Sequence, residues 1–358
     1  MDNKQNRSSA AQARTARRSF LVKAGVGAGA AALGAVPGIS LAAGKPEVTW
    51  KAVLQHRNGA QYKKWLWLET ELPKRTDGRL ALELTTIPEL GLTGAEMLRV
   101  MKSGLIDIAE VLSGYVASDY PVMEAPELPG LISSTEQSRQ IYDVWVKDFV
   151  RKHEDRMGGT AIATFSYGTM PLFTRFPMDS LDALKGKKIR VFSPAQSRYI
   201  TALGGEPLSM PISDVYSALQ RGVMDGLITG FEWVEGMKMW EIATHVSDIH
   251  IAPLGCYIVV SKKGWGKLPA DLQKVVTEIA PELTDMGWAM GQENVDTGLA
   301  LARKNNMTIQ LPSKPEWRPT LKQISTENIV PWWAARTDAE GREAFNKFIA
   351  PIVDIKIA

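Results

Sequence analysis

Short apolar segments alternate with longer helical segments along most of the chain, and this alternation constrains the fold more than any other feature. Val48–Leu54, Leu80–Thr86 and Ile106–Leu112 read as strands, because each is short and apolar in an alternating pattern. Between them, Tyr62–Lys74 and Ala95–Ser103 read as helices. A strand-helix-strand-helix-strand order predicts α/β layering with a largely parallel sheet.

The alternation continues through the rest of the chain. A long helix is expected from Ser134 to about Met157, because Ser134-Thr135-Glu136-Gln137 supplies capping chemistry. Further strands are expected at Thr160–Tyr167, Leu172–Arg175, Lys188–Val191, Asp225–Ile228 and Met307–Leu311, with an apolar strand pair at Ile249–Val260.

One helical segment is longer than a single domain is wide. Lys267 to about Asn305 has apolar residues on one side and would measure some 55 Å at about 1.5 Å per residue. A helix of that length could brace two lobes. Pro281 favours a kink, because proline removes one backbone donor from the helix.

The first 43 residues resemble a bacterial twin-arginine signal peptide. Arg17-Arg18-Ser19-Phe20-Leu21 precedes a weakly apolar Ala/Gly run, and small residues follow where a signal peptidase would cut. An N-terminal membrane anchor is the alternative, but the run has few large aliphatic side chains. We therefore expect residues 1–43 to direct export to the periplasm by the Tat route.

The leader also accounts for the positive charge of the chain. Removing its six basic residues and one acidic residue from totals of 42 and 39 leaves 36 basic and 38 acidic residues. The rest of the chain therefore has no basic excess for neutralising phosphates, and we expect no nucleic-acid partner.

Common catalytic and metal-binding motifs are not found in the sequence. There is no GxSxG, Walker or HExxH motif, and the glycines at 25–29 mimic a dinucleotide loop only inside the leader. His245 and His250 lack a cysteine or paired carboxylate to complete a metal site. The one cysteine, Cys256, lies in an apolar segment and is expected to be a buried thiol. We expect neither metal nor cofactor, and no enzyme activity.

The most informative stretch runs from Asp182 to Gly226. It contains Lys188-Ile189-Arg190-Val191, then Leu203-Gly204-Gly205-x-Pro207, then Met210-Pro211-x-Ser213-Asp214-Val215-Tyr216-Ser217-Ala218-Leu219 and Asp225-Gly226. This stretch resembles the DctP-type substrate-binding proteins of TRAP (tripartite ATP-independent periplasmic) transporters. Segments such as Ser103–Ala109 and Leu268–Gln273 extend the resemblance over nearly the whole chain after the leader.

The resemblance implies a two-lobed α/β periplasmic binding protein fold, with hinge strands and a long helix bracing both lobes. We expect residues 44–171 and 255–295 to form one lobe, and 172–254 and 296–358 the other. The implied function is capture of a small organic acid by hinge closure and its delivery to integral membrane subunits. A periplasmic sensor or enzyme on the same scaffold is the alternative.

The resemblance also implies which arginines bind the carboxylate of the ligand. Arg190 matches the family's ligand-gripping arginine, and a planar guanidinium offers two parallel donors to a carboxylate. Arg175 matches a second, assisting arginine. A salt bridge to a surface acid is the alternative for Arg190, and a solvated or interlobe ion pair is the alternative for Arg175.

Three further candidates follow the strand that ends at Ile228. Thr229 falls where many members have an asparagine that contacts the ligand, so the polar contact there should be smaller. Phe231 and Trp233 add aromatic surface, which could favour a ligand with an apolar or aromatic body. Alternatively, both rings pack against the following helix.

Ligands of α/β proteins bind at the carboxyl ends of strands, which points to two loops of the first lobe. His56 and Asn58 lie in the loop after the first strand, and Tyr115 follows the third. These three are the polar candidates, and each alone could instead stabilise its own loop.

Overall fold

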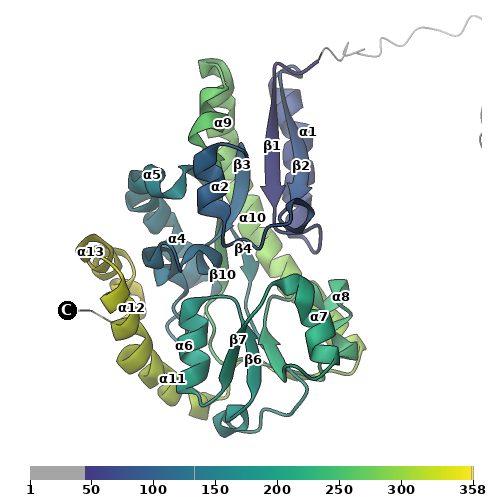
Figure 1. Ribbon diagram of the computed structural model, residues 1–358, viewed down its shortest axis with the longest axis vertical. Helices are drawn as coiled ribbons and strands as arrows, with labels where there is room; N and C mark the ends of the chain where they lie inside the picture. The colour runs from purple at the N-terminus through teal and green to yellow at the C-terminus, as the bar shows by residue number, and fades with distance from the viewer. Residues whose placement is uncertain (1–44, 133, 356, 358) are drawn as a thin grey trace, which may run out of the picture. The chain divides into compact units, whose positions relative to one another are not determined.

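The computed structural model describes residues 45–132, 134–355 and 357, which form two β-sheets (Figure 1). The first sheet has the order β2-β1-β3-β10-β4. Its strands are β1 (Val48–Leu54), β2 (Leu80–Thr86), β3 (Ile108–Leu112), β4 (Gly159–Gly168) and β10 (Leu254–Ser261). β1 is parallel to both β2 and β3, whereas β10 is antiparallel to β3 and β4. The predicted parallel pairing therefore holds for the first three strands.

The second sheet has the order β11-β9-β5-β8-β6-β7. Its strands are β5 (Leu172–Thr174), β6 (Lys188–Val191), β7 (Glu206–Ser209), β8 (Gly226–Ile228), β9 (His245–Ser247) and β11 (Thr308–Gln310). β6 is parallel to β7 and β8. In Figure 1, β1 to β3 lie in the upper half of the picture and β6 and β7 in the lower half.

The helices connect and cover these strands. Those before β5 are α1 (Gln61–Arg75), α2 (Met97–Ser103), α3 (Ser113–Val116), α4 (Thr135–Asp148) and α5 (Glu154–Met157). Those of the second half are α6 (Pro194–Ala202), α7 (Ile212–Gln220), α8 (Trp233–Gly236), α9 (Lys262–Gly266), α10 (Ala270–Lys304), α11 (Arg318–Ile324), α12 (Val330–Arg336), α13 (Ala339–Phe348) and α14 (Ala350–Val353).

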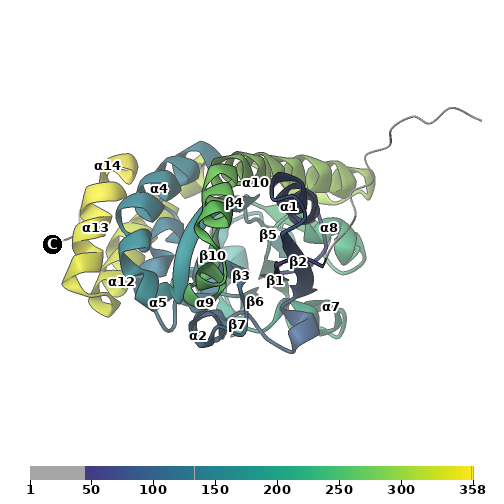
Figure 2. The ribbon, with the colours of Figure 1, turned by 90° about the horizontal axis from the view of Figure 1, so that it is seen from above.

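Three segments join the surroundings of the two sheets. Residues 169–171 connect β4 to β5, and residues 248–253 connect β9 to β10. The third is α10, a helix of 35 residues that continues through Pro281 and packs against β4, α1 and α8 (Figure 2). It also packs against β11. The predicted two-sheet α/β fold with a long bracing helix is confirmed.

Glycines let α10 approach its neighbours closely. A Cβ on Gly291 would lie 2.6 Å from the backbone oxygen of Ser166 in β4, and one on Gly298 would lie 2.6 Å from the backbone oxygen of Phe231. Real Cβ atoms do not come this close to backbone atoms, so a side chain at either position would push the helix away. The sequence of α10 thus fixes its distance from both halves.

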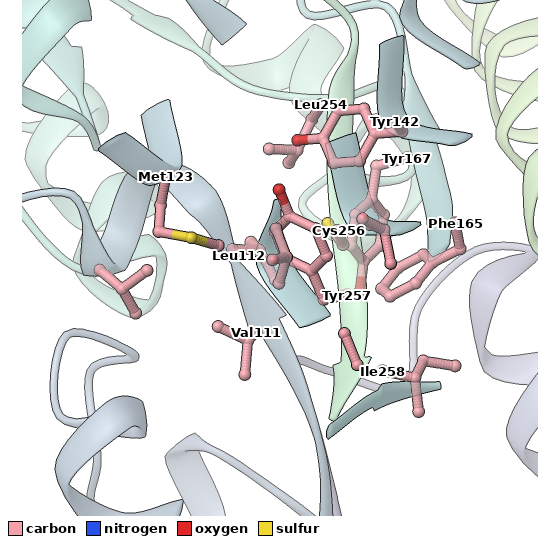
Figure 3. Close-up of a cluster of buried hydrophobic side chains, with 14 of the residues drawn as sticks. Val111, Leu112, Met123, Tyr142, Phe165, Tyr167, Leu254, Cys256, Tyr257 and Ile258 are labelled. Atoms are coloured by element: carbon pink, nitrogen blue, oxygen red, sulfur yellow. The ribbon is translucent and has the colours of Figure 1, made fainter. Parts of the chain in front are cut away.

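The core of the first sheet contains the chain's one cysteine. Cys256 on β10 is fully buried among Leu112, Phe165 and Tyr257 (Figure 3). Burial raises the pKa of its thiol well above the usual value, so the thiol stays protonated and unreactive. The prediction of a buried core thiol is confirmed.

The predicted signal peptide, residues 1–43, lies outside the described residues. Within the described part of the chain, no helix is both long enough and apolar enough to span a bilayer. The lobe boundaries stay a prediction. The C-terminal helices contact elements near both sheets, because α13 packs against α4 while the segment between α11 and α12 packs against α6.

Candidate functional site

A narrow cavity of about 30 Å³ lies where the carboxyl ends of parallel strands from the two sheets meet. Its position follows from the topology, because loops at the carboxyl ends of β1, β3, β6 and β8 all reach it. Its lining residues are Gln55, His56, Leu112, Tyr115, Tyr167, Met170, Arg190, Phe192, Ile212, Thr229, Glu232, Trp233 and Leu254. The space suits a group as small as a carboxylate or about two water molecules.

Arg190 is the charged centre of this cavity. It lies on β6 and is only 1% exposed, and it has no carboxylate partner among the described residues. Its Nε donates to the carbonyl of Met210 and its Nη1 to the carbonyl of Ile228, both at 3.1 Å. Its Nη2 is buried without a hydrogen-bond partner in the described structure. The backbone therefore fixes the guanidinium and leaves the two N–H groups of Nη2 for another molecule.

Two aromatic side chains flank the guanidinium. The Phe192 ring centre lies 5.3 Å from Arg190 Cζ, and the Tyr115 ring meets Phe192 edge-on at 5.7 Å. Burial lowers the pKa of Arg190, and the nearby Tyr115 hydroxyl partly offsets this. Arginine still keeps its charge, because its ordinary pKa is above 12. The site thus presents a permanent, poorly solvated positive charge.

An aromatic wall of the same cavity is formed by His56, Tyr167 and Trp233. The ring centre of His56 lies 4.6 Å from that of Trp233 and 5.3 Å from that of Tyr167. Burial lowers the pKa of His56 to about 4, so this imidazole is neutral at pH 7. Its Nδ1 accepts from the Asn58 backbone N–H at 3.2 Å.

A buried ion pair supports the first-sheet side of the cavity. Lys64 Nζ lies 2.6 Å from Glu110 Oε1, and neither side chain is more than 1% exposed. Glu110 also accepts from the Tyr167 hydroxyl at 2.9 Å and the Gln55 backbone N–H at 2.8 Å. Burial would raise the pKa of Glu110, but Lys64 and the hydrogen-bond donors bring it below its usual value. The ion pair therefore positions Tyr167 and Gln55.

The structure brings together five of the eight predicted site residues in one cavity. They are Arg190, Thr229, Trp233, Tyr115 and His56. Thr229 follows β8 and is 3% exposed.

The other three predicted residues lie elsewhere. Arg175 is exposed at the far end of β5, where its Nη1 donates to the carbonyl of Leu219 at 3.2 Å. Strands β5 and β6 present opposite ends to the cavity, because β5 is antiparallel to β8 and β6 is parallel to it. Phe231 is buried against Phe173 and α10, and Asn58 lies against Gly236 of α8. Phe231 therefore packs in the core, against β5 and α10; packing against the following helix, the alternative given for it, stays a prediction.

Sequence reasoning did not identify Gln55, Tyr167, Phe192 and Glu232 as site residues. Gln55 and Phe192 directly follow β1 and β6, so the rule about carboxyl strand ends could have found them. Tyr167 ends the expected strand Thr160–Tyr167 and lies at the carboxyl end of β4, so the same rule could have found it. Glu232 carries no such local signal.

The two histidines considered for a metal are separated by the strand end at Ser247. His245 lies on β9, and His250 lies in the connection to β10. Within the described residues, no group of three or more His, Cys, Asp or Glu side chains could hold a metal ion.

A cationic cavity between two α/β halves that are joined by two connecting segments and a long helix defines the class of two-lobed solute-binding proteins. The family model for bacterial extracellular solute-binding protein, family 7 (DctP), matches residues 54–329. The chain belongs to this family, which comprises substrate-binding proteins of transporters. The resemblance to DctP-type proteins is therefore confirmed.

Two curated relatives illustrate the family. The sialic acid-binding periplasmic protein SiaP of Vibrio cholerae is 26% identical over 230 residues, which are 63% of this chain and 70% of that protein. The C4-dicarboxylate-binding periplasmic protein DctP of Rhodobacter capsulatus is 24% identical over 260 residues, which are 71% of this chain and 78% of that protein.

Solved structures share the fold. A Bordetella pertussis extracytoplasmic solute receptor binding pyroglutamic acid has a TM-score of 0.78 at 20% identity, covering 84% of this chain and 99% of that one. A TRAP solute-binding protein from Sulfurospirillum deleyianum with bound succinate has a TM-score of 0.75 at 23% identity, covering 85% and 99%.

Proposed function

We propose that this protein captures a small organic acid between its two sheets, holds the carboxylate on Arg190, and delivers the acid unchanged to TRAP membrane subunits. The observation that carries this proposal is a guanidinium that is 99% buried, has no acidic partner among the described residues and keeps Nη2 unbonded. Burying a charge without a counter-charge costs free energy, so an anionic ligand supplies the counter-charge that the described residues do not provide for Arg190.

The known ligands of related structures support an acidic ligand. Pyroglutamic acid and succinate, which two of these structures bind, both carry a carboxylate. The aromatic wall of His56, Tyr167 and Trp233 favours a ligand with an apolar or aromatic body next to that carboxylate.

Closure of the two halves is part of the proposed function. The cavity of about 30 Å³ is smaller than an organic acid, so a ligand enters when the halves part. Met170 lines the cavity and also lies in the connection between β4 and β5. Ligand contacts from both halves then favour the closed form, because a ligand shifts an equilibrium only through differential binding.

The place of action we propose is the periplasm, the compartment named for the curated relatives SiaP and DctP. The twin arginines Arg17-Arg18 support export by the Tat route. Replacing both by lysine should retain the precursor in the cytoplasm.

The test of ligand capture compares two arginines. Arg190→Ala should abolish binding of an acid that stabilises the wild-type protein in a thermal-shift screen of organic acids, followed by calorimetry. Arg175→Ala is the matched control, because it removes an exposed guanidinium outside the cavity, and it should leave the affinity unchanged.

Unchanged affinity in Arg190→Ala would contradict the proposal. Loss of binding in both variants would also contradict it, because the effect would then not be specific to the cavity. A folded Arg190→Ala protein is expected, because the side chain makes only two backbone hydrogen bonds, and circular dichroism checks this.

A further inference from the structure

Three buried polar atoms without hydrogen-bond partners in the described structure belong to residues lining the same cavity. They are Gln55 Nε2, Arg190 Nη2 and Glu232 Oε2, on side chains whose residues are 9%, 1% and 6% exposed. Glu232 also lines a second cavity, together with Lys63, Glu293 and Asn294. Buried polar groups in native proteins nearly always have partners, so we expect these three atoms to bind another molecule. A bound molecule that satisfies all three is the simplest explanation.

The three atoms approach from both halves of the protein. Gln55 follows β1 of the first sheet, and its backbone N–H is held by Glu110 at 2.8 Å. Arg190 lies on β6 of the second sheet, and Glu232 lies directly before α8. A molecule that contacts all three must therefore bridge the two halves.

The chemistry of each atom specifies its partner. Arg190 Nη2 is a charged donor and takes a carboxylate oxygen. Gln55 Nε2 is a neutral donor and needs an acceptor, whereas an ionised Glu232 needs a donor and a protonated one can do either. Burial raises the pKa of Glu232 to about 8, which weakens its repulsion of an anionic ligand at neutral pH.

A ligand group that carries both a hydrogen-bond donor and an acceptor can satisfy both Gln55 and Glu232. A hydroxyl both donates and accepts, and an amide carries one N–H donor and one carbonyl acceptor. A methyl group of the same size would leave both side chains buried and unpaired, which binding sites reject strongly.

We propose that the ligand is a carboxylate with a second group, a hydroxyl or an amide, and that Gln55 and Glu232 hold this second group. This inference rests on the proposed function. The carboxylate defines the class of ligand through Arg190. The second group then determines which carboxylates bind tightly, so aliphatic acids of the same shape that lack a hydroxyl or amide bind more weakly.

The experiment uses the mature protein and pairs of acids that differ in this one group. The pairs are lactate and isobutyrate, malate and 2-methylsuccinate, and pyroglutamate and cyclopentanecarboxylate. Calorimetry should show that, in the pair that binds best, the hydroxyl or amide member binds at least tenfold more tightly than its apolar counterpart.

Two variants test whether Gln55 and Glu232 cause this preference. Glu232→Leu and Gln55→Leu should each reduce the preference to less than threefold, and both remove a buried unpaired atom, so both should fold. Glu235→Leu is the matched control, because Glu235 is an exposed residue three positions along the chain, and it should keep the full preference.

The outcomes separate this inference from the proposed function. If acids bind through Arg190 but the apolar members bind equally well, the inference is wrong and the proposed function stands. If both Leu variants keep the preference, the assignment to Gln55 and Glu232 is wrong. If no acid binds in any pair or in the thermal-shift screen, the proposed function itself fails.

Discussion

Two buried cations, Lys64 and Arg190, show how the same kind of residue takes different roles. Lys64 is fully buried and paired with Glu110, whereas Arg190 is equally buried and has two backbone carbonyls, the Tyr115 hydroxyl and the Phe192 ring as neighbours, but no acid. Burial lowers the pKa of both side chains, but only Lys64 has an acid nearby to offset it. Lys64 therefore belongs to the scaffold, and Arg190 is available to an external anion.

This difference predicts opposite effects on stability. Lys64→Met leaves Glu110 buried and unpaired, and should lower the free energy of unfolding by about 3–5 kcal/mol. Arg190→Met removes a buried charge that has no counter-charge, and should leave the ligand-free protein as stable as the wild type or more so. Urea denaturation without ligand measures both.

Lys63→Met is the control for this pair of variants, because Lys63 is an exposed neighbour whose ion pair with Glu293 lies at the surface. It should change stability by less than about 1 kcal/mol. Equal destabilisation by Lys64→Met and Arg190→Met would show that Arg190 is also a structural residue.

At the scale of elements, local sequence predicts regular segments well and their interruptions poorly. The expected strand Leu80–Thr86 and the helix expected at Tyr62–Lys74 agree with β2 and α1. The helix expected from Ser134 to Met157 ends at Asp148, and a short 3-10 turn separates it from α5. The predicted strand pair at Ile249–Val260 is wrong: it is one strand, β10, preceded by an irregular connection. Both errors fall where tertiary packing, rather than periodicity, decides the backbone path.

The close approach of α10 to β4 predicts the effect of a single methyl group. Gly291→Ala places a Cβ 2.6 Å from a backbone oxygen of β4, so it should destabilise the fold by about 1–3 kcal/mol despite the better helix propensity of alanine. Gly266→Ala at the end of α9 is the control, because a Cβ there meets nothing within 4 Å. Thermal unfolding measures both variants, and similar melting temperatures would contradict the packing argument.

At the scale of the whole molecule, the sequence predicted the layout better than the contents of the site. The α/β alternation and the long helix could be predicted from the residue pattern. Arg190 could be predicted from the family resemblance. Gln55 and Glu232 could not, because an unpaired buried atom is a property of the surroundings that the fold assembles. Arg175 shows the converse, since its position next to a strand did not reveal which end of that strand faces the cavity.

The whole molecule also carries a pH dependence. Burial raises the pKa of Glu124 to about 7 and the pKa values of Glu127 and Glu232 to about 8, whereas the unfolded chain ionises them near 4.3. Between about pH 4.3 and these values the folded state binds more protons than the unfolded state. These three groups therefore make stability fall as pH rises, by about 1.4 kcal/mol per group and pH unit.

Glu232→Gln should remove the contribution of one titrating carboxyl group to this pH dependence of stability. Its urea-denaturation stability between pH 5.5 and pH 7.5 should fall less steeply than that of the wild type, by about 1.4 kcal/mol per pH unit. The other charged or titratable groups that line the two cavities next to Glu232 are unchanged in the variant; they are His56, Tyr115, Tyr167, Arg190, Lys63, Glu235 and Glu293. Parallel curves for the two proteins would show that Glu232 is ionised in the fold.

Because Cys256 is buried, the separation of the two halves can be followed with thiol-reactive dyes. The chain has one cysteine, and its thiol is inaccessible and held protonated. Maleimide dyes will therefore label only cysteines introduced at exposed positions, such as one on α2 and one on α7. Energy transfer between such dyes can follow the separation of the two halves in single molecules without first removing a native thiol.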